Sequence, residues 1–279
     1  MALFGKKCAV CGGKAGMLSN KAIQGGVICG DCAGKLSLFF DGFKSADATQ
    51  IAAQIQAREQ NRVALERFQP TKAWGVKKYQ VAMQFIYDAE QRAFVVVEGP
   101  EETFRERNPD IIRFDQVRDV WLEVVENWSE DGGQYAPNGV GQLLQDRYKE
   151  VFWRYDFILH IELAHPYLRE IAYPMNFKTT VMQVPQRGFM FRRGLEMGGA
   201  YHGDDISALA NALDRTESRE RTSIDLNRKL DVVLLRRKSQ SLGEKIIQGF
   251  EDEVYLKKID NMCAHVRRAE RIRALTMGL

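Results

Sequence analysis

Residues 8–32 read CAVCGGKAGMLSNKAIQGGVICGDC, and this stretch decides how the N-terminal part of the chain folds. It contains two C-x2-C pairs separated by seventeen residues, a spacing typical of a structural zinc site. Two residues between cysteines allow a tight turn to aim both thiolates at one ion, and two such turns supply a tetrahedral four-sulfur shell. We therefore predict one structural Zn²⁺ per chain, with Cys8, Cys11, Cys29 and Cys32 as its ligands.

The residues around the cysteines favour tight turns and a short hairpin. Gly12 and Gly13 follow the first pair and Gly30 lies within the second, and glycine permits the positive backbone angles that such turns use. Residues 14–32 predict a β-hairpin, and the segment after Cys32 favours a helix. A module this small buries little apolar surface, so metal binding is expected to supply much of its folding free energy.

Two other interpretations of the cysteines fit the sequence less well. Disulfides are characteristic of exported proteins, and the N-terminal MALFGKKCAVCGG lacks the long apolar core of a signal peptide. A thioredoxin-like redox site would need a single C-x-x-C in a βαβ context. A closed four-cysteine shell leaves no open coordination position, which disfavours catalysis by the metal. The fifth cysteine, Cys263, is interpreted as a small buried hydrophobe rather than a nucleophile.

The composition is that of a folded protein with unevenly distributed charge. The 279 residues are 45% hydrophobic and 28% charged, which excludes wholesale disorder and suggests two domains, or one with appendages. The net charge of +3 does not point to a dedicated nucleic-acid binder. However, residues 1–45 carry +4 and residues 219–279 carry +5, which leaves −6 for the middle. No apolar run approaches the ~18–20 residues that cross a bilayer, and we expect a cytoplasmic protein.

A linking helix is expected between a zinc module at 1–45 and the rest of the chain. Residues 46–68 are rich in helix formers, Asp47 or Ser45 can provide the N-cap, and Pro70 stops the helix. The apolar side chains of this helix are Ile51, Ile55, Val63, Leu65 and Phe68. They form a thin stripe, which indicates a helix that lies on a surface or bridges two modules, and we assign it residues 46–70.

Residues 71–216 are expected to form an antiparallel β domain. Apolar and alternating segments predict strands at 81–88, 93–99, 117–126, 151–163 and 169–175. Few helical stretches interrupt them, which favours antiparallel pairing. A helix then begins at an N-cap of Asp204 or Asp205, with Ile206, Leu209, Ala210 and Leu213 facing inward. A bent antiparallel sheet followed by one amphipathic helix favours a pleckstrin-homology-like (PH-like) barrel closed by that helix, so the expected fold class is α+β.

Three segments resemble an uncharacterised bacterial family that pairs an N-terminal four-cysteine zinc module, of zinc-ribbon or treble-clef type, with a PH-like β domain. They are LFGKKCAVCGGKAGML (3–18), GGVICGDCAGKLS (25–37) and NPDIIRFDQVRDVWLEV (108–124). The resemblance covers roughly residues 1–215. It implies a fold but no established activity, so it assigns no catalytic residue.

Residues 217–279 are expected to form a helical tail. Amphipathic patterns predict helices at about 217–241 and 242–275, with a break at Gly243. Such helices pack on their own domain or pair with another chain, which would make a homo-oligomer. Three basic pairs interleave with acids along the tail, and they are interpreted first as solvated helix faces: Arg236–Arg237, Lys257–Lys258 and Arg267–Arg268.

Signatures of enzyme chemistry are not found in the sequence. There is no G-x-S-x-G elbow, no P-loop, no H-E-x-x-H and no complete G-x-G-x-x-G. His160 and His165 flank a strand end near Glu162 and would be the only other candidate metal ligands, although a structural role is favoured for them. His202 precedes carboxylates that are better explained by helix capping. We therefore expect a protein that is not an enzyme.

Two functions fit these observations. The first is an intracellular, zinc-containing adaptor or scaffold that binds protein partners through the PH-like domain and assembles through residues 217–279. The alternative is a nucleic-acid-associated protein that uses the basic zinc module and the basic tail. Peripheral binding to an anionic membrane through the same lysines, with Leu3 and Phe4, is a third possibility.

Overall fold

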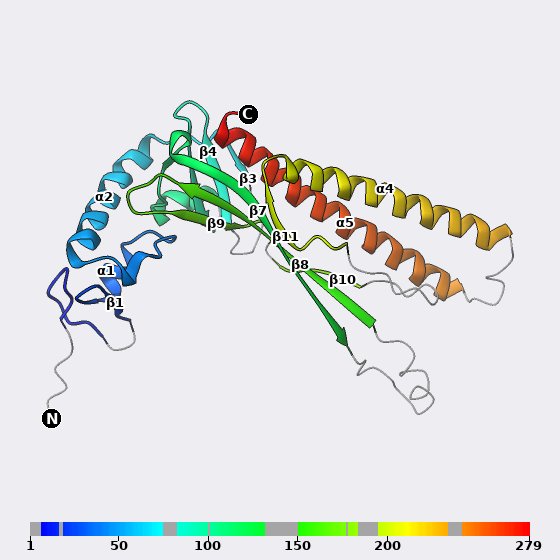
Figure 1. The fold of residues 1–279 in the computed structure, drawn as a ribbon, viewed down its shortest axis with the longest axis horizontal. Helices are drawn as coiled ribbons and strands as arrows, with labels where there is room; N and C mark the ends of the chain where they lie inside the picture. The colour runs from blue at the N-terminus through cyan, green and yellow to red at the C-terminus, as the bar shows by residue number, and fades with distance from the viewer. Residues whose placement is uncertain are drawn as a thin grey trace, which may run out of the picture. The chain divides into compact units, whose positions relative to one another are not determined.

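The computed structural model describes residues 7–16, 19–74, 83–99, 101–131, 150–176, 178–183, 195–233 and 242–279 (Figure 1). The chain divides into two units. The first comprises residues 1–120, 160–173 and 276–279, and the second comprises residues 121–159 and 174–275. Within the described residues the protein is a mixed α+β structure, as expected. No described helix has the length and apolarity needed to cross a membrane.

The first unit begins with the cysteine-rich module. The predicted hairpin is present, with β1 (Lys21–Ile23) paired antiparallel to β2 (Gly26–Ile28). The first helix, α1 (Gly30–Gly34), differs from expectation because it contains Cys32 rather than following it. The helix begins earlier because the Cys29 sulfur caps it. A short 3₁₀ helix (Gly42–Lys44) follows.

The next helix, α2 (Ala48–Arg67), lies within the range in which the sequence predicts a helix. Asp47 is the N-cap, and a capping box with Gln50 is complete. Ile51 packs into the apolar cluster of the cysteine module, whereas Leu65 and Phe68 pack into a second cluster formed with the sheet that follows. The thin apolar stripe is therefore two separate contacts, one at each end of the helix.

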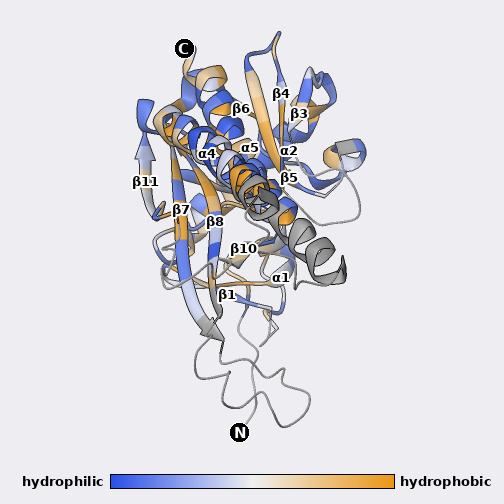
Figure 2. Ribbon diagram, turned by 90° about the vertical axis from the view of Figure 1, so that its right-hand side faces the viewer, coloured by the Kyte–Doolittle hydropathy of each residue, from blue (hydrophilic) through white to orange (hydrophobic). Residues whose placement is uncertain are grey.

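The sheet that follows α2 has four antiparallel strands, in the order β3 (Lys72–Trp74), β4 (Met83–Asp88), β5 (Ala93–Glu98) and β6 (Ile112–Arg113). A 3₁₀ segment (Glu101–Arg107) precedes β6. β5 is apolar along most of its length and is buried from Ala93 to Val97 (Figure 2). β4 and β5 confirm the strands predicted near 81–88 and 93–99, although residues 81 and 82 lie outside the described part.

The other large sheet has the strand order β10-β8-β7-β11, and β9 also pairs with β8. Its strands are β7 (Val117–Asp131), β8 (Glu150–Leu163), β9 (Glu170–Pro174), β10 (Thr180–Gln183) and β11 (Gly199–His202). β7, β8 and β9 confirm three predicted strands. Burial alternates along β7 and β8, since Leu122, Val124, Tyr155 and Phe157 are all at most 2% exposed and the residues between them are not buried.

The described strands form separate sheets that do not close, so a PH-like barrel is not shown. The expected closing helix begins at Asp204, so Asp204 and Asp205 lie in its first turn rather than at the predicted N-cap, and the helix continues as α4 to Val233. No glycine or proline interrupts residues 204–233, and the helices predicted on either side of residue 216 are one element. The last helix is α5 (Leu242–Met277).

The helices α4 and α5 pack side by side in the second unit (Figure 1). Ser207 on α4 donates to Glu270 on α5 at 2.5 Å, and Cys263 on α5 donates to Asp214 on α4 at 2.7 Å. Arg267 also forms an ion pair with Asp214. These contacts run in opposite directions along the two helices, which makes α4 and α5 an antiparallel pair.

Candidate metal centre

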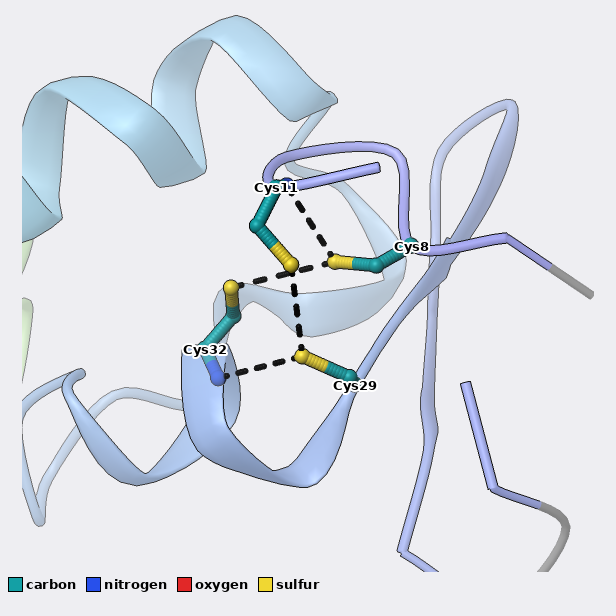
Figure 3. A group of neighbouring side chains, drawn as sticks. All are labelled: Cys8, Cys11, Cys29 and Cys32. Atoms are coloured by element: carbon teal, nitrogen blue, oxygen red, sulfur yellow. Dashed lines mark hydrogen bonds between the residues drawn. The ribbon is translucent and has the colours of Figure 1, made fainter. Parts of the chain in front are cut away.

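The four predicted cysteines lie together in the first unit (Figure 3). Their Sγ atoms are all within 4.8 Å of one another. The Sγ atoms of Cys8 and Cys32 are 3.8 Å apart, and those of Cys11 and Cys29 are 3.7 Å apart. A tetrahedral shell with Zn–S bonds of about 2.3 Å has sulfur–sulfur edges of about 3.8 Å, whereas a disulfide is about 2.05 Å long. The sulfurs are therefore spaced for a metal ion, and all four thiols are free.

The first cysteine pair forms a tight turn around the sulfur of Cys8. The backbone N–H of Cys11 points at Cys8 Sγ over 3.5 Å. Gly12 has a φ of +71°, the positive angle predicted for it, and its N–H donates to the Cys8 carbonyl at 2.9 Å. Cys8 N–H in turn donates to the carbonyl of Gly13 at 2.7 Å. The turn thus directs an amide dipole at the sulfur and stabilises the thiolate that a metal requires.

The second pair uses the start of α1 for the same purpose. Cys29 is the N-cap, and its Sγ accepts from Cys32 N–H over 3.5 Å. The helix N-terminus favours negative charge on that sulfur. Gly30 is required for a different reason from the one expected, because its φ is not positive. A Cβ at Gly30 would lie 2.9 Å from Ser19 Cβ, so glycine is needed for close approach.

Burial and nearby backbone N–H groups shift the pKa values of the cysteine thiols in opposite directions. Cys8, Cys29 and Cys32 are 3%, 7% and 6% exposed, whereas Cys11 is exposed. Burial raises the pKa of Cys8, but hydrogen bonds from the backbone of Cys11, Cys29 and Val10 outweigh burial and lower it to about 6. Burial and the neighbouring thiols raise the pKa of Cys32. The backbone N–H groups around Cys8 therefore favour the charged form of its sulfur.

The histidines do not join a metal site among the described residues. The four cysteines are the one group of three or more potential ligands found there. His160 forms an ion pair with Glu170. His165 accepts from Tyr167 N–H at 3.3 Å, and burial lowers its pKa. The ring of His202 stacks on Trp121 with centroids 5.2 Å apart. The structural roles favoured for these histidines are consistent with these contacts.

A buried polar cluster beside the metal centre was missed by the sequence reasoning. Arg58 on α2 is 9% exposed and forms an ion pair with Asp110 at 2.6 Å. Asp110 also accepts a hydrogen bond from the hydroxyl of Ser37 at 2.5 Å. Ser37 lies five residues after Cys32, the last of the four cysteines. An arginine on the expected polar face of a helix gives no sign of burial. The one available signal was Asn-Pro at 108–109, which marks a turn.

The geometry defines the N-terminal part of the chain as a four-cysteine metal-binding module. Residues 6–54 match a family described as "Domain of unknown function (DUF4428)". The match supports the module part of the resemblance given above and does not extend to the β domain. No curated protein and no solved structure matches the chain.

Proposed function

We propose that the protein is a non-enzymatic, zinc-containing adaptor or scaffold. The observation that carries this proposal is the closed sulfur cluster. Four sulfurs at tetrahedral spacing would occupy all four coordination positions of a zinc ion. Such an ion has no position left for water or substrate, so its role would be to hold the module folded.

Zinc fits the donor set of the site. Thiolates are soft ligands, and four of them in a tetrahedral arrangement suit zinc or an iron–sulfur centre. Bound zinc neutralises thiolate charge and fixes the two turns to each other. The chain itself contributes the amides of Cys11 and Cys32, which donate to the ligand sulfurs and orient them.

Partner binding would use surfaces on the module and on the β region, for which a PH-like barrel remains our proposal. Support on the module comes from residues 38–43, where apolar side chains reach solvent. Leu38 is 56% exposed, and the rings of Phe40 and Phe43 contact each other while covering the module's apolar cluster from outside. Apolar groups that gather at a surface favour contact with another protein.

Assembly through the C-terminal helices would need a face that the chain does not itself cover. The inner stripe of α5 is buried, including Ile259, Met262 and Val266. On α4, Leu226 is 53% exposed. We therefore propose that the face of α4 that carries Leu226 is the assembly surface. Light scattering should find an oligomer for the purified chain and a smaller species for Leu226→Glu. A monomer at all concentrations would refute assembly.

The adaptor proposal is tested in two stages. Elemental analysis should find about one zinc per chain, and Cys29→Ser should lose it. A photo-crosslinking residue at Leu38 should then capture a defined protein in the native host, and the purified partner should bind wild type more tightly than Leu38→Glu. Lys178→Glu, exposed and outside the module, is the control. Equal binding by Leu38→Glu and wild type would refute this surface as the docking site.

The alternative function, nucleic-acid association, is supported by one specific contact. Lys7 and Lys14 are partners in an antiparallel bridge and are both exposed. Like charges directly opposite across strands are unfavourable, and a phosphate would relieve their repulsion. Lys6, Leu3 and Phe4 lie outside the described residues, so peripheral membrane binding gains no support here and remains a prediction.

Nucleic-acid binding is tested by fluorescence anisotropy with labelled single-stranded and duplex DNA across a range of salt concentrations. The double variant Lys7→Ala with Lys14→Ala should reduce the slope of log K against log salt by about 2, since each phosphate contact contributes about 0.9 for a duplex. Lys178→Ala is the matched control. No binding by wild type at low salt would exclude this function.

A further inference from the structure

Arg58 joins two segments that are far apart in the sequence. Its Nε donates to the Lys35 carbonyl at 2.9 Å, on the cysteine module. Its Nη2 donates to the Asn108 carbonyl at 2.6 Å, and its Nη1 to Asp110 at 2.6 Å, both just before β6. The guanidinium is therefore shared between the metal-binding module and the approach to the sheet.

The module side of this contact depends on the metal ligands. Lys35 is the C-cap of α1, and its N–H donates to the carbonyl of Cys32 at 3.2 Å. Ser37, 7% exposed, donates to the second oxygen of Asp110 at 2.5 Å. Leu36, between them, is 5% exposed and belongs to the same apolar cluster as Cys8 and Cys29. Segment 35–37 is thus held in place by the helix that carries a metal ligand.

The sheet side of the contact is equally well defined. Asn108 has a φ of +47°, an unfavourable angle for most residues, and its side chain donates to the Arg58 carbonyl at 3.0 Å. Asn61 on α2 donates to the Pro109 carbonyl at 2.8 Å and accepts from the N–H of Ile111 at 3.0 Å. The conformation of residues 108–111 is therefore imposed by α2, and β6 begins at the next residue.

We infer that the metal state of the four-cysteine centre is transmitted to segment 108–113 through Arg58. Loss of the metal frees Cys32, loosens α1 and removes the Lys35 and Ser37 contacts. The Arg58–Asp110 ion pair then remains in a mostly buried position but loses two of the hydrogen bonds that satisfy its charges, which is unfavourable. Because coupling between two sites is reciprocal, loss of the Arg58 contacts must in turn weaken metal binding. The inference rests on the metal centre but not on any partner of the proposed adaptor.

The first test is zinc affinity, measured by competition with a chromophoric chelator. Arg58→Met should weaken zinc binding about tenfold, within the usual range of coupling between sites. Ser37→Ala removes the hydrogen bond to Asp110 and the one that Ser37 accepts from Phe39 N–H, but it leaves Arg58 in place, and it should weaken zinc binding by a smaller factor. Arg105→Met is the control, because Arg105 holds the other end of α2 through the carbonyls of Leu65 and Phe68. Equal losses in Arg58→Met and Arg105→Met would indicate general destabilisation and overturn the inference.

The second test is hydrogen–deuterium exchange of wild type with and without a zinc chelator. Exchange in peptides covering residues 108–113 should rise on zinc removal, whereas the β4–β5 hairpin should stay protected. Arg58→Met should show the raised exchange with zinc still bound. Unchanged exchange at 108–113 after chelation would overturn the inference, and so would a chain that binds no metal. Neither test uses a partner, so failure of the adaptor proposal would leave both readouts intact.

Discussion

The thiols of the five cysteines should become reactive in two steps. A chelator should make four of them reactive, and the fifth, Cys263, should react only after the chain is unfolded. Cys263 is 5% exposed and donates to Asp214 at 2.7 Å. Burial and the carboxylate of Asp214 raise the pKa of the Cys263 thiol, and Arg267 lowers it by less, so that the resulting pKa is about 12. Cys263 is therefore expected to be chemically inert in the folded chain.

The size of the effect follows from the fraction of thiolate. At pH 8 a thiol with a pKa of about 12 is ionised to about 1 part in 10⁴. An ordinary cysteine, with a pKa of about 8.5, is about one-quarter ionised at the same pH. The reactive form of Cys263 is thus depleted on the order of 10³-fold, before any loss of reagent access is counted.

The assay is thiol counting with a chromogenic disulfide reagent at pH 8. The zinc-loaded chain should react slowly with the reagent and release little chromophore. Addition of a chelator should expose four thiols, and denaturant should expose the fifth. Cys263→Ala should give the same count with and without denaturant once the chelator is present. A fifth thiol that reacts with the chelator alone would refute the burial and pairing of Cys263.

Three further outcomes follow from single contacts. Gly30→Ala should cost about 1–3 kcal/mol of stability because its Cβ would lie 2.9 Å from Ser19, and Ser19→Gly should restore part of the loss in chemical denaturation. Burial, with Arg268 nearby, lowers the pKa of His265 to about 4, below its unfolded value of about 6.5. The unfolded chain therefore binds the extra proton, and stability should fall by about 2 kcal/mol from pH 7 to pH 5, a loss absent in His265→Phe. Asp47→Ala should cost about 1 kcal/mol, seen as a lower Tm, because the side chain caps the third N–H of α2.

Local patterns were sufficient where the structure depends on neighbours in the sequence. The C-x2-C spacing predicted the sulfur cluster, and apolar and alternating segments predicted the strands β7 and β8. The start of α1 was misplaced because a cysteine is rarely considered as an N-cap. The end of the helix that starts at Asp204 was misplaced because a domain boundary was expected at residue 216. No glycine or proline separates the amphipathic segments on either side of that residue, and they form one helix.

Contacts between distant segments could not be derived in this way. Arg58 and Asp110 are 52 positions apart, and each looks like an ordinary surface charge in its own segment. Whether sheets close into a barrel also depends on pairings across long separations, which alternation within single strands does not specify. The positions of strands could therefore be predicted from the sequence more reliably than whether the sheets close into a barrel.

The described contacts argue that α2 is a shared structural element rather than a spacer. Ile51 is fully buried in the cluster that also contains Cys8 and Cys29, and the family match ends at residue 54, one turn later. Beyond that point the helix contacts the sheet through Leu65 and Phe68. A rigid helix that contributes to both clusters cannot move with respect to one without disturbing the other. This arrangement gives the metal centre a physical connection to the sheet, and Arg58 is the residue where the two sets of contacts meet.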